Sequence, residues 1–238
     1  SYTKINVQNQ RDLTSHALDL LMLENGIRRD DRGGVVNGSL LADVGCGSGL
    51  SGEEISRRGH AWVGIDASAA MLTQAVERRG ENHHHHHHHQ HGTPSPSGVD
   101  PSAAAAAVAE AEGAVALVDF AQGLPFRTEA FDGCVSISAA QWLCAGTTSI
   151  TTAPNTSIAA AGGGATSSSS SSSSSVMKRD KLDRFFGAVM RCVKPGARAV
   201  LQVYPADVRD TWQMESSMRR VGLVGAAVTD FPHKTPNK

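Results

Sequence analysis

Three glycines at alternate positions follow an aspartate near the start of the chain. Residues 40–44 are apolar apart from Asp43, and Gly45, Gly47 and Gly49 come directly after them. Glycine lets a backbone turn sharply and approach a ligand with no Cβ atom in the way. The pattern predicts a buried strand, a tight turn and a helix, with the turn and the helix start beside a nucleotide-like ligand.

Aspartates at the ends of two further apolar segments narrow the choice of ligand. Residues 61–66 end in Asp66, about 20 residues after Asp43, where an acid can bind the hydroxyls of a ribose. Residues 114–119 end in Asp119. Asp43 would repel a pyrophosphate but attract a cation. We therefore expect S-adenosylmethionine, whose sulfonium and ammonium groups are positive, and NAD remains the alternative.

Alternating strands and helices are predicted along the rest of the chain from apolar runs and helical spacing. Predicted strands cover residues 40–44, 61–66, 114–119, 131–138, 199–204 and 225–231. Predicted helices cover residues 14–23, 51–58 with Ser51 as N-cap, 68–79 with Ser68 as N-cap, 176–193 and 214–221. This order is typical of a single α/β domain over residues 1–238. We expect a mostly parallel sheet, helices on both faces and the ligand at the carboxyl ends of the strands.

Two low-complexity segments interrupt this pattern. Residues 82–113 contain a run of histidines (83–89), a Pro/Ser patch and a run of alanines, and residues 146–175 end in a run of serines (167–175). A long insertion in a surface loop costs little free energy, because loop-closure entropy grows only slowly with length. We therefore predict two disordered insertions, and no metal site at the histidines. The four cysteines lack C-x-x-C spacing, so we predict buried reduced thiols rather than a zinc site.

The charge balance and the apolar content argue against two broad classes of function. The chain has 22 basic and 23 acidic side chains, a formal net charge of −1. Bulk positive charge is therefore not what would hold a nucleic acid, although RNA delivered by a partner is compatible with this balance. No apolar run approaches the ~20 residues of a membrane span, so we expect no membrane partner.

Four sequence segments extend well beyond a generic glycine motif. They are residues 43–55 (DVGCGSGLSGEEI), 62–66 (WVGID), 131–144 (FDGCVSISAAQWLC) and 198–205 (RAVLQVYP). Through these segments the chain resembles class I S-adenosylmethionine methyltransferases, whose sheet is Rossmann-like. More narrowly, it resembles the eukaryotic enzymes that methylate guanine N7 in small-subunit (18S) ribosomal RNA. The resemblance spans nearly the whole chain apart from the two insertions.

The resemblance implies a set of cofactor-binding residues around the predicted turn. In chain order the set is Tyr2, Asp43, Gly45, Cys46, Gly47, Gly49, Asp66, Asp119, Phe120 and Ser136. The turn would pass under the methionine part of the cofactor, with Ser136 beside the methionine tail. Asp66 would bind the ribose, and Asp119 and Phe120 the adenine. Tyr2 would help to cover the pocket, although the family's Asn-Ser-Arg word is absent near it, and a seventh strand and a basic tail would follow the last residue.

The reaction implied by the resemblance needs alignment rather than acid–base catalysis. Guanine N7 carries a free lone pair, so we expect no general base, and catalysis would come mainly from alignment and desolvation. Gln141, Trp142 and Tyr204 border the expected methyl position and are predicted to position the base. Trp142 or Tyr204 would stack on the guanine, which becomes positively charged on methylation. The alternative is that Trp142 belongs to the hydrophobic core.

Residues Ala114–Val118 are predicted to form an uncharged strand at the edge of the sheet, which invites pairing with another chain. The resemblance implies a small zinc-binding methyltransferase activator protein at this edge. The alternative is that the first insertion covers it. The resemblance also implies small-subunit rRNA or a pre-ribosomal particle as substrate, a role in small-subunit biogenesis, and action in the nucleus, nucleolus and cytoplasm.

Two other functions remain open from the sequence. A class I methyltransferase that acts on a small molecule or a protein would share the same turn and the same acids. A pre-ribosome assembly factor would bind the particle through the fold, with methylation dispensable. Substituting Asp66 would separate a methyltransferase from a non-catalytic assembly factor, because scaffolding should survive the loss of cofactor binding.

Overall fold

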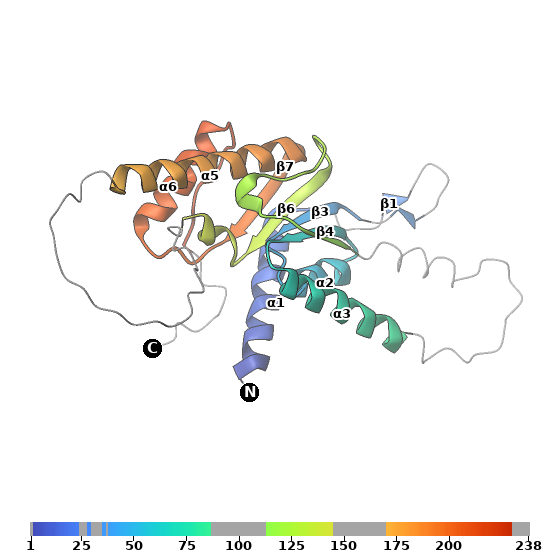
Figure 1. The fold of residues 1–238 in the computed structure, drawn as a ribbon. Coiled ribbons are helices and arrows are strands. Elements are labelled where there is room, and N and C mark those ends of the chain that lie inside the picture. Colours follow the sequence, from blue (N-terminus) through green and yellow to red (C-terminus); the bar gives the residue numbers. More distant parts are fainter. Residues whose placement is uncertain are drawn as a thin grey trace, which may run out of the picture.

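A five-stranded parallel sheet forms the centre of the molecule (Figure 1). The computed structural model describes residues 2–23, 28–29, 35–36, 38–86, 113–144 and 170–229. The strands lie in the order β5-β4-β3-β6-β7. Their bounds are β3 Leu40–Val44, β4 Ala61–Asp66, β5 Ala114–Leu117, β6 Phe131–Ile137 and β7 Val193–Gln202. A separate antiparallel pair consists of β1 (Arg28–Arg29) and β2 (Val35–Val36).

Helices cover both faces of this sheet. In Figure 1, α1, α2 and α3 lie on one side and α5 and α6 on the other. Their bounds are α1 Tyr2–Leu21, α2 Leu50–Arg57, α3 Ala69–His86, α5 Ser170–Cys192 and α6 Val208–Arg220, and two short 3-10 helices are η2 (Phe120–Gln122) and η3 (Ala140–Leu143). The prediction of a mostly parallel sheet with helices on both faces is confirmed.

Apolar side chains pack in two layers, one on each face of the sheet. On one face, Leu182 and Phe185 of α5 pack with Val44 of β3. On the other face, Leu18 of α1 packs with Leu41 of the same strand. Successive residues of a strand point to opposite faces, so one short apolar strand supplies both layers. Among the described residues, no helix has the length and the apolar character needed to cross a bilayer.

The first helix begins at Tyr2, twelve residues before the predicted start at Thr14. Polar side chains support its first half: Gln8 Nε2 donates to Asp12 Oδ1 at 2.7 Å, one turn away. Arg11 Nη2 donates to Glu53 Oε2 of α2 at 2.9 Å. These contacts carry no apolar periodicity, which is why the apolar pattern predicted only residues 14–23.

The predicted strand 225–231 is wrong over residues 225–229, where the structure has no strand, and residues 230–231 lie outside the described residues. Ala227 N donates to Glu215 Oε1 at 2.7 Å instead of to a neighbouring strand. α6 begins at residue 208 rather than 214, because Asp207 caps it and accepts a bond from Arg209 N at 2.8 Å. β7 begins at residue 193 rather than 199, with a shift in register at Phe131 and Gly133 of β6.

Both predicted insertions are helical at one end. α3 continues to His86 and α5 begins at Ser170, so the prediction of disorder from residue 82 and up to residue 175 is wrong for these ends. Histidine and serine runs contain no glycine or proline that would end a helix, so a helix stabilised elsewhere can extend into them. Residues 87–112 and 145–169 lie outside the described residues. All four cysteines are free and buried, as predicted.

Candidate functional site

A pocket of about 610 Å³ opens at the carboxyl ends of the central strands, where the sequence predicts the ligand. Its walls come from the turn after β3, the end of β4, the 3-10 helix η2 and the loop after β6. Of the predicted site residues, Gly45, Cys46, Gly47, Asp66, Asp119, Phe120 and Trp142 line it. They meet because parallel strands place all their carboxyl ends at the same edge of a sheet.

Backbone hydrogen bonds hold the glycine turn against the end of β4. The N–H groups of Gly45 and Cys46 both donate to Ile65 O, at 2.8 and 3.0 Å. Gly49 N donates to Cys46 O at 2.9 Å and closes the turn before α2. Gly45, Gly47 and Gly49 have φ angles of 74°, 53° and 83°. Residues with a Cβ atom seldom adopt these angles, so the turn requires glycine.

Bare backbone at this turn also sets the width of the pocket. An ideal Cβ atom at Gly45 would lie 2.2 Å from Ala139 Cβ and 3.7 Å from the ring of Phe120. At Gly47 an ideal Cβ atom would lie 3.2 Å from Met71 Cε. The turn therefore lies close against the loop after β6, and any added side chain would have to displace a wall of the pocket.

Both carboxylate oxygens of Asp66 accept hydrogen bonds from the backbone. Oδ2 accepts from Gly47 N at 3.0 Å and Oδ1 from Ser68 N at 2.8 Å. Ser68 also caps α3 as predicted, since its Oγ accepts a bond from Met71 N at 3.3 Å. Each carboxylate oxygen has a further lone pair. Asp66 can therefore hold the turn and still accept a bond from a ligand hydroxyl in the pocket.

Asp43 lies completely buried at the end of β3. Its Oδ2 accepts a bond from Ser51 Oγ at 2.5 Å, and among the described atoms its Oδ1 has no partner. Burial raises the pKa of Asp43 to about 7, although the Ser51 bond lowers it, and the charge of Asp66 raises it further. Ser51 does not cap α2, which corrects the sequence prediction: Gly49 holds the cap position without a side-chain bond.

Asp119 and Phe120 form another wall of the pocket. Asp119 caps η2, with Oδ1 accepting from Ala121 N at 3.0 Å, and its side chain is exposed. The Phe120 ring packs edge-on against Phe185 of α5, with centroids 5.8 Å apart. A carboxylate beside an aromatic ring is a combination that can bind a heterocycle carrying an amino group.

The charges of the site favour a cationic ligand. Asp66 and Asp119 line the pocket, Asp43 lies close enough to Asp66 for their charges to interact, and among the described lining residues Lys181 is the only cation. Cys46 offers no nucleophile, because burial, with the charges of Asp43 and Asp66, raises the pKa of its thiol. A buried carboxyl with an unused oxygen is stabilised by a positive group nearby.

Trp142 lies at the rim of the pocket and is 68% exposed, so the alternative that it is a core residue is wrong. Gln141 lies outside the lining, and its Nε2 donates to Ser138 O at 2.8 Å. Tyr204 also lies outside the lining and is exposed just beyond the end of β7. The structure thus brings one of the three predicted positioning residues to the pocket wall itself.

Three predicted cofactor-binding residues that the structure describes, Asp43, Gly49 and Ser136, do not line the pocket. Asp43 is buried, and Gly49 is the residue before α2 begins. Ser136 is completely buried on β6, next to Cys134 and Val135, and its Oγ has no partner among the described atoms. The side chain of Tyr2 lies outside the described residues.

Sequence reasoning missed several lining residues. Gln10 lines the pocket from α1, which the apolar pattern did not extend that far. Met71 of α3 and Lys181 of α5 also line the pocket, and neither is among the predicted site residues. Ser138 lines it with a φ of 56°, a strained angle for a residue other than glycine, which no sequence signal predicts.

Known proteins match this chain over the same elements. Residues 41–97 match the family described as "Methyltransferase domain". An Arabidopsis thaliana protein named 18S rRNA (guanine-N(7))-methyltransferase RID2 is 34% identical over 98% of this chain and 58% of its own length. A Mus musculus 18S rRNA (guanine-N(7))-methyltransferase is 34% identical over 96% of this chain and 58% of its own length. Over most of its length, this chain is therefore similar to proteins named as methyltransferases.

The chain spans about 58% of the length of these two curated relatives of the methyltransferase family. A Saccharomyces cerevisiae protein named 18S rRNA (guanine(1575)-N(7))-methyltransferase is 29% identical over 94% of this chain and 57% of its own length. Among solved structures, the chain resembles the [4+2]-cyclase SpnF with a TM-score of 0.48 and 15% identity, over 89% of this chain and 57% of that one.

Proposed function

We propose that this protein transfers a methyl group from S-adenosylmethionine to N7 of a guanine in small-subunit ribosomal RNA. The observation that carries the proposal is the pocket: a bare glycine turn, Asp66, Asp119 and Phe120 meet at one sheet edge beside the buried carboxyl of Asp43. The relatives named as 18S rRNA (guanine-N(7))-methyltransferases, at 34% identity, supply the substrate class.

The reaction is a displacement at a methyl carbon. The N7 lone pair forms the new C–N bond as the C–S bond breaks, and S-adenosylhomocysteine leaves with the electron pair on sulfur. N7 carries no proton, so no residue needs to act as a general base. The residues of the pocket would bind, orient and exclude water, and alignment of this kind can supply roughly 7–11 kcal/mol.

The proposal gives roles to four lining residues and to the buried Asp43. Asp66 accepts bonds from the ribose hydroxyls, and Asp119 and Phe120 hold the adenine. The buried carboxyl of Asp43 stabilises the cationic methionine part by its charge, and Trp142 stacks on the guanine from the rim. We also propose the positioning and cofactor-binding roles that the resemblance implies for Gln141, Tyr204, Ser136 and Tyr2. The pocket lining does not itself support these roles.

The cofactor is tested by thermal-shift titration of the chain with S-adenosylmethionine and, separately, with NAD. We expect stabilisation by S-adenosylmethionine alone, and a weaker response in Asp66→Asn. Asp183→Asn is the matched control, because Asp183 is also a hydrogen-bonded aspartate but lies on α5 away from the pocket lining. Stabilisation by NAD alone would contradict the proposal.

The acceptor is tested by methylation of 18S rRNA transcripts, read out by cleavage at N7-methylguanine. Transcripts in which the modified guanine is replaced by 7-deazaguanine should accept no methyl group, because carbon replaces the attacking nitrogen. Equal transfer to the deaza transcript, or turnover on a small acceptor and none on RNA, would contradict N7 of rRNA as the target.

The proposal includes a protein partner at the edge of the sheet. β5 pairs only with β4 among the described strands, and Leu117 at its end is 62% exposed. An unpaired edge can accept a strand from a second chain, and we propose that a small zinc-binding activator protein binds there. We also propose that the methyltransferase acts in the nucleus, nucleolus and cytoplasm. Full solubility and activity of the chain expressed alone would contradict an obligate partner.

A further inference from the structure

Two of the three tryptophans are exposed at the end of the molecule where the pocket opens. Trp142 and Trp212 expose 68% and 64% of their surface, whereas Trp62 is buried. Trp142 borders the pocket from η3, and Trp212 lies on the second turn of α6. Large aromatic rings exposed near one another are typical of a binding surface.

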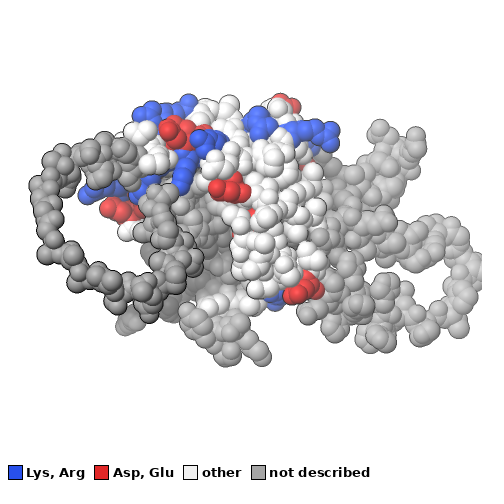
Figure 2. Space-filling model, in the orientation of Figure 1, with Lys and Arg blue, Asp and Glu red and all other residues white. Residues whose placement is uncertain are grey.

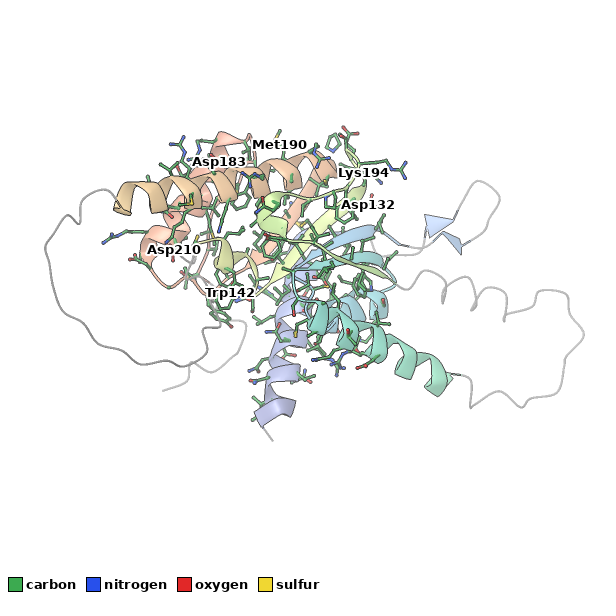
Figure 3. The ribbon with its side chains drawn as sticks, viewed as in Figure 1. Asp132, Trp142, Asp183, Met190, Lys194 and Asp210 are labelled. Atoms are coloured by element: carbon green, nitrogen blue, oxygen red, sulfur yellow. The ribbon has the colours of Figure 1, made fainter. Side chains whose placement is uncertain are left out.

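The elements that carry these two rings are in contact. Cys144 Sγ, just beyond η3, donates a weak bond of 3.9 Å to Asp210 O of α6. Trp142 precedes Cys144 by two residues, and Trp212 follows Asp210 by two residues. Figure 3 shows Trp142 and Asp210 at the same end of the molecule, below the start of α5. The two elements that carry the rings therefore meet at one short contact.

Basic side chains of α5 lie near this contact. Lys181 lines the pocket, and Lys178 lies one helical turn before it. Burial raises the pKa of the Cys144 thiol to about 11, and Lys178 opposes this increase, so the ammonium lies near the contact between η3 and α6. The charge of Asp210 raises the same pKa, so one carboxylate also lies near this contact. The carboxylate of Asp183 accepts a bond from Arg220 of α6, and that of Asp207 accepts one from Arg209 N. Figure 2 shows Lys and Arg side chains interspersed with Asp and Glu along the edge that α5 and α6 form.

We propose that single-stranded RNA next to the target guanine runs from the pocket over η3 onto the start of α6. A neighbouring base stacks on Trp212, and a phosphate lies at Lys178. Aromatic platforms combined with basic side chains bind single strands in this way, since every base offers a face to stack. A short single strand places few phosphates on the surface, so a few basic side chains are enough to neutralise them. The inference rests on the proposed function and adds the path of the RNA.

The test measures binding of a fluorescein-labelled single-stranded RNA of roughly 12 nucleotides with a central guanine, within the usual range for such sites. We expect Trp212→Ala to weaken binding roughly 5- to 150-fold, the usual effect of removing one stacked base, and Trp212→Phe to restore most of the affinity. Met190→Ala removes an exposed apolar side chain elsewhere on α5 (Figure 3) and should leave affinity unchanged.

The salt dependence of binding separates the phosphate contact from the stacking contact. Over about 50 to 200 mM salt, Lys178→Ala should reduce the slope of log K against log salt by about 0.7, the value for one phosphate of a single strand. Trp212→Ala should leave this slope unchanged. Lys194→Ala is the matched control, since Lys194 pairs with Asp132 at 2.7 Å, far from Trp142 in Figure 3.

Failure of this inference is distinguishable from failure of the proposed function. If the unaltered protein methylates RNA and the Trp212 and Lys178 variants bind like the controls, the path over α6 is wrong and the proposed function stands. Equal affinity for a duplex of the same sequence would also overturn it. If the unaltered protein neither binds nor methylates RNA, both are wrong.

Discussion

Alanine at Gly45 tests whether the bare turn is required by its close approach to the loop after β6. Gly45 has a φ of 74°, and an added Cβ atom would lie 2.2 Å from Ala139 Cβ. Neither atom can rotate away, because each is bonded directly to its backbone. The left-handed φ costs about 1–2 kcal/mol, and overpacking costs about 1–3 kcal/mol more. We expect Gly45→Ala to lose about 2–5 kcal/mol of the free energy of unfolding, together with its affinity for S-adenosylmethionine.

Gly59 is the matched control for this substitution. Its φ of 80° is nearly the same, but nothing lies within 4 Å of an ideal Cβ atom there. Gly59→Ala should therefore lose only the backbone part, about 1–2 kcal/mol, and keep its cofactor affinity. Urea denaturation measures both variants, and Ala139→Gly added to Gly45→Ala should recover the difference. Equal losses at Gly45 and Gly59, within about 0.5 kcal/mol, would show that the reasoning about the close approach is wrong.

Three further predictions concern the buried layers and the site. A cationic cofactor should favour the charged form of Asp43, whose pKa is about 7. The affinity for the cofactor should therefore fall by up to about tenfold per pH unit below pH 7. Calorimetry in two buffers should detect the proton that Asp43 releases on binding, and Asp43→Asn should abolish this release. Gly52→Ala would place a Cβ atom 2.1 Å from the Trp62 ring and should cost about 1–3 kcal/mol in urea denaturation. Burial raises the pKa of Asp183, but bonds from Arg220 and a serine of α6 outweigh it and hold the pKa below its usual value. Asp183→Asn should therefore lower the free energy of unfolding by about 1 kcal/mol at neutral pH. This difference should vanish at low pH, where Asp183 of the unaltered protein becomes protonated.

The core of the fold and the pocket floor could be predicted because their signals are local. The strand before Gly45 is apolar apart from Asp43. Asp66 ends its strand, and Asp119 follows the end of β5 by two residues. A parallel topology then brings separate strand ends together without any further information. This is why seven of the predicted site residues line one pocket.

Features that depend on distant partners could not be predicted in this way. Ser51 has the residue type and spacing of a helix cap, yet its hydroxyl bonds Asp43, a partner that only the folded strand supplies. The first half of α1 makes a contact with α2 through Arg11 and Glu53, which are distant in the sequence. Residues 225–229 are apolar enough for a strand, but in the described structure they pair with no strand, and β7 pairs only with β6. Local pattern specifies what a segment can form, and tertiary contact decides among the possibilities.

The two backbone bonds accepted by Asp66 give this residue a second duty that does not depend on any ligand. Gly47 and Ser68 would both lose an acceptor if the carboxylate were removed, whether or not the protein ever turned over a substrate. A descendant that had lost its chemistry would still be under selection to keep this aspartate for the sake of folding. An aspartate at this position in a homologue is therefore weak evidence that the homologue is an active enzyme.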